Sequence, residues 1–242
     1  MKKLFTLVGL SFFLLSACNE DPNQDPIDDL PLAFAEIGET SCGLTDFKYY
    51  NDAPLSLGEM SNDYIYIGVD GNDSDRDITN HVLSTGFFDH DQELFISNSG
   101  NLDTEFKHMV VKLRKSCNCG EIAWVLNELM EDSRITFAHY TFQSDPCGDI
   151  NLPPVQCVST YSNYFYVKVK DPQDLTDLDA TANATNTEVI HQNEFMDNWF
   201  TLKAGKDAQG DAMKLANFFY ETGLFDAAEP DNYKRAVESQ DP

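Results

Sequence analysis

Basic side chains are scarce in this 242-residue chain, which has 16 Lys and Arg against 41 Asp and Glu and a formal net charge of −25. A chain this acidic repels the phosphates of nucleic acids and anionic lipid headgroups, so we expect neither as a direct partner. We interpret the acidity as a source of solubility rather than as an acidic functional patch.

Recognisable catalytic motifs are also missing. The sequence contains no Gly-x-Ser-x-Gly elbow, no His-Glu-x-x-His, no phosphate loop and no dinucleotide fingerprint. Cys117 and Cys119 form a Cys-x-Cys pair, but no second pair or histidine spacing completes a zinc site. We therefore expect a protein that is not an enzyme and has no cofactor or metal. The scattered histidines are interpreted as surface or strand residues: His81, His90, His108, His139 and His191.

One acidic segment, residues 70–77, alternates side-chain oxygens in the way that a calcium loop does. It lacks the central glycine of such a loop, and His81 stands at the twelfth position where a glutamate is needed. We interpret the segment as a solvated turn that caps the following helix, with calcium binding as the alternative.

The N-terminal apolar stretch, Leu4 to Leu15, is too short to span a bilayer and follows Lys2 and Lys3. Leu15-Ser16-Ala17-Cys18 then matches the lipobox of bacterial lipoproteins. We expect cleavage of a signal peptide (residues 1–17) before Cys18 and lipidation of that cysteine. The alternative is an ordinary signal peptide with a chance cysteine.

The segment after Cys18 is polar, acidic and proline-bearing up to residue 33, so it is expected to form a tether rather than to fold. Asn19 is not the aspartate that often retains such proteins in the inner membrane. We therefore expect an outer-membrane lipoprotein, anchored only by its lipid and facing either the periplasm or the cell surface.

Five further cysteines lie in a compartment that permits disulfides. Cys147 and Cys157 bracket a proline-rich stretch, and we predict a bridge between them. Because five is odd, at least one thiol is expected to remain free or to pair between molecules.

Internal similarity organises the rest of the chain. The alternating segment that begins at Tyr64 (YIYIGV) recurs one hundred residues later from Tyr164 (YFYVKV), and both are rich in strand formers. A helical apolar stripe also recurs at an offset of ninety residues, and its flanking residues recur with it. Ile122, Val125, Leu126, Leu129 and Met130 correspond to Ala212, Leu215, Ala216, Phe219 and Tyr220. This pattern indicates a duplication.

Each copy is predicted to run strand, helix, strand, strand, helix, strand. The fold class is therefore α+β, with two tandem ferredoxin-like (βαββαβ) antiparallel-sheet domains. The first copy has these elements at 64–70, 75–88, 92–98, 107–114, 119–132 and 135–142. The second has them at 163–170, 171–184, 187–193, 196–203, 207–223 and 224–229, with Asp171-Pro172 starting its first helix and Gly223 ending its last. The predicted units are a first domain (34–145), a linker (146–160), a second domain (161–231) and a tail (232–242).

The tyrosines at 64, 66, 164 and 166 have side-chain parity opposite to the apolar residues between them. They are expected to line the sheet faces that the helices leave open. Such an aromatic face is either a docking surface or the seam between the copies.

The stretch from Phe165 to Asp231 resembles the N-terminal propeptide-like domain of bacterial subtilisin-like serine proteases. The resemblance is carried by YVKVK from Tyr166, EVI from Glu188, FMDNWF from Phe195, ANFFYETGLF from Ala216 and AEPD from Ala228. Upstream, the segment from Tyr49 to Leu57 resembles the small hairpin that opens such precursors. The chain has none of the protease's catalytic strings and ends eleven residues after Asp231.

The resemblance implies that the outward side of strands 163–170 and 196–203 packs on a protease while the following tail lies in its substrate cleft. It names Tyr164, Tyr166, Asn232, Tyr233 and Lys234 as protein-binding residues. We accordingly expect a non-enzymatic binding module, an inhibitor or chaperone of a subtilisin-like serine protease. The alternative is a surface adhesion or structural lipoprotein that binds another protein or a glycan.

Overall fold

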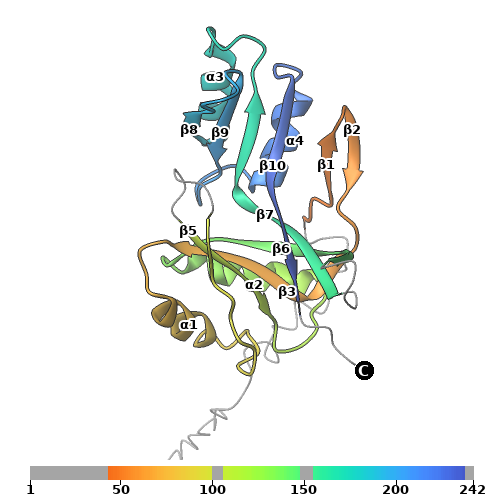
Figure 1. Cartoon of the computed structure of the whole chain (residues 1–242), viewed down its shortest axis with the longest axis vertical. Helices are drawn as coiled ribbons and strands as arrows, with labels where there is room; N and C mark the ends of the chain where they lie inside the picture. The colour runs from red at the N-terminus through yellow and green to blue at the C-terminus, as the bar shows by residue number, and fades with distance from the viewer. Residues whose placement is uncertain (1–42, 100–105, 148–154, 238–242) are drawn as a thin grey trace, which may run out of the picture.

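The computed structural model describes residues 43–99, 106–147 and 155–237, and the fold is of the α+β class with antiparallel strands (Figure 1). Cys18, the signal peptide and the tether lie outside these residues. Within the described part, no helix is both long enough and apolar enough to cross a membrane.

The first half of the molecule is the segment from residue 60 to residue 147. Its strands pair antiparallel in the order β4-β5-β3-β6, with the two helices packed on one face. Its elements are β3 (Met60–Asp70), α1 (Asp75–Leu83), β4 (Ser97–Asn98), β5 (Phe106–Lys112), α2 (Cys119–Glu131) and β6 (Ile135–Cys147).

The second half, from residue 155 to residue 236, has the same order of elements. Its strands pair antiparallel in the order β8-β9-β7-β10. This order matches that of the first half when β3, β4, β5 and β6 correspond to β7, β8, β9 and β10. Its elements are β7 (Val155–Lys168), α3 (Thr176–Thr185), β8 (Glu188–Gln192), β9 (Trp199–Lys203), α4 (Ala212–Glu221) and β10 (Ala227–Ala236).

The two halves share one eight-stranded sheet, because β7 extends from one half into the other. Along one edge it pairs first with β6, from Val155 to Ser159, and then with β9, from Tyr164 to Lys168. The predicted linker over 146–160 is therefore wrong at both ends, because residues 146–147 belong to β6 and residues 155–160 to β7. The predicted bridge between Cys147 and Cys157 is confirmed, with the two Cα atoms 5.8 Å apart.

The predicted tail is also wrong at its start. Strand β10 continues past Asp231 to Ala236 and pairs with the first part of β7, from Asn232 opposite Tyr161 to Ala236 opposite Cys157. The first part of β7 supplies main-chain hydrogen-bond partners to β10, and these hydrogen bonds hold residues 232–236 in the sheet.

Two hydrophobic clusters stabilise this arrangement. The larger one lies between the sheet and the helices, where the apolar stripes of α2 and α4 face the strands. The smaller one, here called the seam cluster, lies where the helix-free faces of the two halves meet. It consists of Tyr64, Tyr66, Phe106, Val110, Phe137, Val158, Tyr164 and Val237. Of the two interpretations of the tyrosine faces, the seam between the halves is confirmed.

Local sequence signals explain most helix ends. Helix α2 begins with a capping box between Asn118 and Glu121, and α4 begins after the N-cap Asp211. Gly223, with φ +69°, follows the end of α4 as predicted. The predicted start of α3 at Asp171-Pro172 is wrong. The Asp171 carboxylate instead accepts the Gln173 N–H in a turn, and the helix begins at Thr176.

The predicted N-terminal hairpin is present as β1 (Phe47–Tyr50) and β2 (Ala53–Ser56), and both residues of its turn have positive φ. It packs on α4 in the second half rather than on the first domain to which the sequence assigned it. The Asn217 amide donates to the Phe47 carbonyl over 2.9 Å, and the Tyr49 hydroxyl donates to the Glu221 carboxylate over 2.9 Å.

The two remaining described cysteines differ in state. Cys117 is buried as a thiol whose Sγ donates to the Lys115 carbonyl over 3.4 Å. Cys119 is disulfide-bonded, and its partner lies outside the described residues.

Candidate binding site at the seam between the two halves

An aromatic hollow of about 320 Å³ opens at the edge of the seam cluster. Strand alternation aims Tyr66 and His108 into it from the first half, and Tyr164 and Tyr166 from the second. Strand β10 adds Tyr233, whose ring stacks on Tyr66 at 5.6 Å and meets the His108 ring edge-on at 4.6 Å. The hollow is therefore built by both halves, and it requires the seam.

A carboxyl group lies in this hollow. Asp231 sits where a bulge interrupts the pairing of β10 with β7, and its oxygens accept from the Ser162 hydroxyl at 2.8 Å and the Tyr166 hydroxyl at 3.2 Å. Burial raises the pKa of Asp231, although both hydrogen bonds act in the opposite direction. A positive charge placed beside the carboxylate would replace the lost hydration and stabilise its ionised form.

Burial keeps His108 and Tyr164 of the hollow neutral near pH 7. Burial lowers the pKa of His108 to about 4, and burial raises the pKa of Tyr164 to about 12. Neutral rings present negatively charged faces, which attract cations. The ring faces and the Asp231 carboxylate thus attract positive charge, and two basic side chains of the protein already lie beside the hollow. Arg235 donates to the Ser97 and Tyr233 hydroxyls at 3.3 and 3.4 Å, and Lys203 Nζ lies 5.8 Å from the centroid of the Tyr164 ring.

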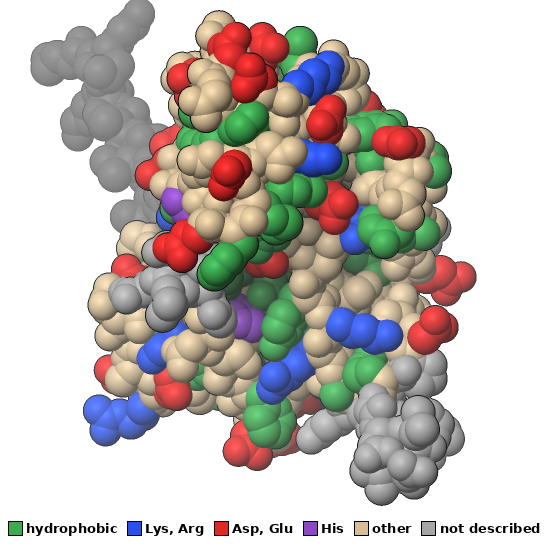
Figure 2. Space-filling model, turned by 45° about the horizontal axis from the view of Figure 1, so that its top comes forward, with side chains coloured by type: hydrophobic (Ala, Val, Ile, Leu, Met, Phe, Trp, Pro, Cys, Tyr) green, Lys and Arg blue, Asp and Glu red, His purple; other side chains and the backbone are tan. Residues whose placement is uncertain are grey.

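An apolar groove of about 560 Å³ adjoins the hollow, and the two share the cross-strand pair Tyr166 and Thr201. Phe195 is 91% exposed and Met196 is 50% exposed on the connection between β8 and β9. The Asn193 side chain accepts both of their backbone N–H groups, at 2.9 and 3.0 Å, in a turn that holds the two residues together. Figure 2 shows hydrophobic side chains and a histidine in the hollowed region between the halves.

The carboxylates of the groove give it an acidic lining. Its lining includes Glu194 and Glu229 but no lysine or arginine among the described residues. Trp199 and Phe200 complete the apolar wall. The groove therefore suits a ligand that is apolar and basic.

The structure brings together three of the five predicted binding residues, Tyr164, Tyr166 and Tyr233. Asn232 and Lys234 alternate to the solvent side of β10, where both are exposed. The expectation of an open sheet face is wrong, because the first half covers it and leaves Tyr164 only 7% exposed.

Sequence reasoning missed Asp231, His108 and the exposed Phe195 as site residues. Phe195 lies in one of the strings that carry the family resemblance. Its exposure follows from the Asn193 turn, which is a local signal. Asp231 and His108 are far apart in the sequence, and no local pattern links them.

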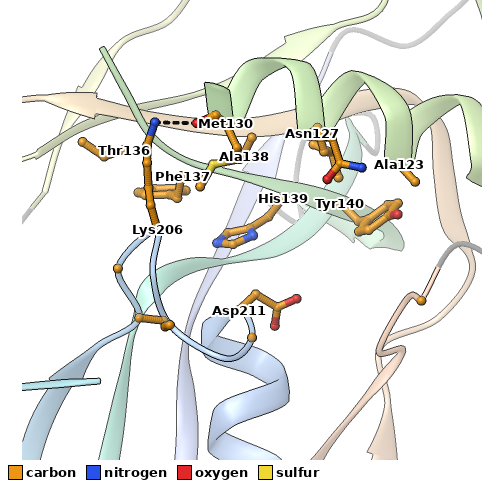
Figure 3. A pocket seen from close by; sticks show the side chains of 16 residues that line it. Ala123, Asn127, Met130, Thr136, Phe137, Ala138, His139, Tyr140, Lys206 and Asp211 are labelled. Atoms are coloured by element: carbon orange, nitrogen blue, oxygen red, sulfur yellow. Dashed lines mark hydrogen bonds between the residues drawn. The ribbon is translucent and has the colours of Figure 1, made fainter. Parts of the chain in front are cut away.

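A separate cavity of about 310 Å³, here called the edge cavity, lies between α2, β6 and the connection from β9 to α4 (Figure 3). Lys206 spans it from the second half and donates from Nζ to the carbonyls of Met130 and Asp132, at 2.6 and 2.7 Å. These bonds satisfy the C-terminal end of α2 and fix the distance between the two walls.

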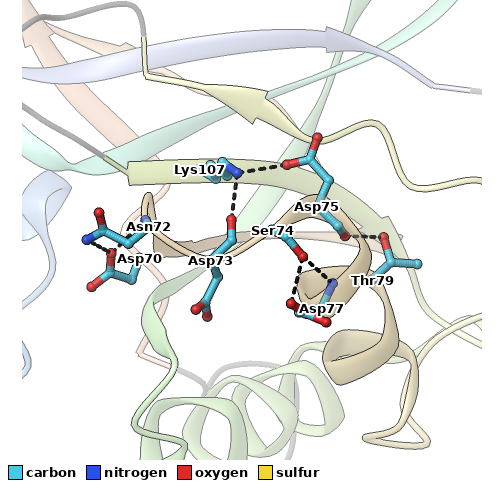
Figure 4. A network of polar contacts seen from close by, with 8 residues as sticks. All are labelled: Asp70, Asn72, Asp73, Ser74, Asp75, Asp77, Thr79 and Lys107. Atoms are coloured by element: carbon cyan, nitrogen blue, oxygen red, sulfur yellow. Dashed lines mark hydrogen bonds and ion pairs between the residues drawn. The ribbon is translucent and has the colours of Figure 1, made fainter.

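The acidic segment 70–77 caps α1, as interpreted from the sequence (Figure 4). Ser74 is the N-cap and accepts the Asp77 N–H at 3.2 Å. The Lys107 ammonium donates to the Asp73 carbonyl at 2.6 Å and to the Asp75 carboxylate at 2.8 Å. A lysine therefore engages two of the oxygens that a calcium ion would need. In the described part of the chain, no group of three or more His, Cys, Asp or Glu side chains could hold a metal.

Comparison with known proteins gives no family assignment. No family model and no curated protein matches the chain. Among solved structures, the small subunit of acetolactate synthase from Thermotoga maritima aligns with 9% identity and a TM-score of 0.26, over 73% of this chain and 98% of that one. A TM-score this low supports no argument on fold or function.

Proposed function

We propose that the mature protein is a non-enzymatic binding protein, held on the outer membrane by lipid at Cys18, and that it captures a protein partner at the seam site. The observation that carries this proposal is the 91% exposure of Phe195 beside the half-exposed Met196 and an apolar groove. Exposed aromatic and methionine side chains that cluster at a hollow are typical of protein-binding surfaces.

The partner that fits is a polypeptide segment with an apolar side chain next to a lysine or arginine. The apolar side chain would pack on Phe195 and Trp199 in the groove. The basic side chain would enter the aromatic hollow, where ring faces and the Asp231 carboxylate attract a cation. Glu194 and Glu229 at the groove add complementary charge.

The proposal includes a duplication, in which each half is one ferredoxin-like unit. It is supported by the matching order of elements and of paired strands in the two halves. A lone unit would expose its aromatic sheet face, whereas two units cover each other's faces and leave a ligand hollow at the edge of the contact.

This arrangement favours an adhesion or structural partner over a subtilisin-like protease. The face that the propeptide resemblance assigns to the protease is covered by the first half, and residues 232–236 are paired in the sheet. A protease recovered at the seam site would revise the identity of the partner but not the location of the site.

Site-specific photocrosslinking tests the proposal. A photoreactive phenylalanine analogue at Phe195 should yield a discrete crosslinked product in native membranes. The same analogue at Phe218, which is 45% exposed on α4 and remote from the groove in sequence, is the matched control and should not yield that product. Absence of any product at Phe195, or identical products at both positions, would rule out the seam site.

A charge variant tests the chemistry of the partner. Glu229→Gln keeps the size of the side chain and removes one of the two groove carboxylates, so the crosslink yield at Phe195 should fall and should lose part of its salt dependence. An unchanged yield at every ionic strength would show that the partner is not basic.

A further inference from the structure

The edge cavity has a strand edge as one wall. Strand β6 pairs with β3 along residues 135–142, but its pairing with β7 begins only at Phe142. No strand among the described residues pairs with residues 135–141 on the side away from β3. A strand edge without a partner, next to a cavity, offers main-chain donors and acceptors to an incoming strand.

One hydrogen bond shows which way these main-chain groups point. The Thr160 hydroxyl donates to the Tyr140 carbonyl at 2.9 Å, so the backbone groups of Tyr140 point away from β3. Backbone groups alternate along an antiparallel strand, so those of Ala138 point to the same edge as those of Tyr140. The pairing with β3 shifts register at Thr136, between Ile135 and Phe137, so the alternation ends there. Ala138 and Thr136 both line the cavity.

Two buried side-chain atoms of the cavity have no hydrogen-bond partner among the described residues, Nε2 of His139 and Oγ1 of Thr136. His139 is 7% exposed, and its ring points into the cavity toward Asp211 (Figure 3). It is held by stacking on Phe137 at 5.2 Å and on Tyr161 at 4.6 Å. A buried polar atom costs free energy unless it is bonded, so both atoms indicate a ligand that bonds them.

The histidine is neutral at physiological pH, because burial lowers its pKa to about 4. A neutral imidazole offers one donor and one acceptor, as main-chain amides and hydroxyl or amide side chains require. This chemistry suits an uncharged segment of polypeptide.

The facing wall leaves room for a second backbone. Ala204, Gly205, Ala208 and Gly210 line it, so few side-chain atoms project toward β6. A Cβ added at Gly205 would meet no atom within 4 Å, which shows that the space beside this glycine is open.

We propose that the edge cavity is a second, separate binding site, in which an extended segment of a partner protein pairs with the edge of β6 at Ala138, between the register shift at Thr136 and the Tyr140 carbonyl that Thr160 occupies. The segment would exchange main-chain hydrogen bonds with Ala138 and would bond His139 Nε2 and Thr136 Oγ1 with a hydroxyl or amide side chain.

The test uses the full-length protein in detergent and a phage-displayed library of random heptapeptides as the probe. Selected peptides are synthesised, and their affinities are measured by fluorescence anisotropy. Gly205→Phe should weaken binding at least tenfold by placing a ring in the cavity, at a position where the added Cβ meets no atom within 4 Å. Ala138→Pro should do the same by removing the edge N–H, at an edge position where proline is tolerated.

Two further measurements distinguish strand pairing from other modes of binding. N-methylation of alternate peptide amides should abolish binding in one register and leave it unchanged in the other. Thr136→Val should weaken binding, whereas the matched control Thr181→Val on α3, where the hydroxyl bonds only its own helix, should not. If no peptide is selected, or if Gly205→Phe binds the selected peptides as well as the original protein, the edge cavity is not a peptide site. This result is independent of the crosslinking at Phe195.

Discussion

Gly68 is the position where a single methyl group should disturb the seam most directly. It lies opposite Phe137 in the pairing of β3 with β6, and the ring covers it. A Cβ at Gly68 would lie 2.0, 2.3 and 2.4 Å from three ring carbons of Phe137. Carbon atoms normally approach to about 3.5–4.0 Å, so the ring would have to move by about 1.5 Å.

The ring has little room for such a movement. Its centroid is 5.3 Å from that of Tyr66, 5.5 Å from that of Phe106 and 5.2 Å from that of His139. Overpacking of this kind costs about 1–3 kcal/mol or more, and the better strand preference of alanine returns about 0.5–1 kcal/mol. We expect Gly68→Ala to lower the free energy of unfolding by about 2 kcal/mol, or roughly 4–8 °C in Tm.

Calorimetry of the purified protein checks this value. Gly205→Ala is the matched control, because its added Cβ meets nothing within 4 Å, and its Tm should be nearly unchanged. Phe137→Leu should relieve the clash, so the double variant should be more stable than the sum of the single effects by at least about 1 kcal/mol. A Tm for Gly68→Ala equal to that of the original protein, or strictly additive effects, would refute the packing argument.

Three other predictions concern the anchor, the bridge and the buried acid. Cys18→Ala should release the protein from the membrane fraction and abolish palmitate labelling; continued acylation would contradict the lipobox interpretation. Replacing Cys147 and Cys157 together by alanine should lower the free energy of unfolding by about 2–3 kcal/mol in the loop-entropy model, measured by denaturant titration; unchanged stability would refute that contribution. Burial raises the pKa of Asp231 in the folded state above its ordinary value of 3.8. The free energy of unfolding therefore falls as the pH rises from that value through the pKa of the folded state. Asp231→Asn lacks this loss, so its free energy of unfolding minus that of the original protein should increase over the same pH range. A difference that does not change with pH would contradict the burial of Asp231.

The sequence predicted the type and order of the elements, because short-range chemistry determines them, but several bounds were wrong. The predicted strand over 92–98 is only Ser97–Asn98, and the predicted helix over 75–88 ends at Leu83. Period-two alternation from Tyr64 and from Tyr164 identified β3 and part of β7, and the apolar stripes identified α2 and α4. Gly223 marked the end of α4 because it adopts a positive φ. The bridge between Cys147 and Cys157 was predictable because only ten positions separate them.

The candidate sites, in contrast, depend on partners that are distant in the sequence. Alternation shows that Tyr164 and Tyr166 share a face, but it does not show what covers that face. The covering comes from Phe106 and Tyr66, which stack on Tyr164 and Tyr233 across the seam. Asp231 gains its surroundings only because β10 continues beside β7.

The sequence by itself therefore determined the lipobox expectation, the α+β class and most helices and strands, since each rests on residues within a few positions of one another. Tertiary structure decided that β7 joins both halves into one sheet, that the tyrosine faces are buried against each other, and that the edge of β6 is left open. The physical reason is that a strand's main-chain groups can bond any other strand of matching length. The choice among these partners is made by packing over the whole chain, and no local pattern records it.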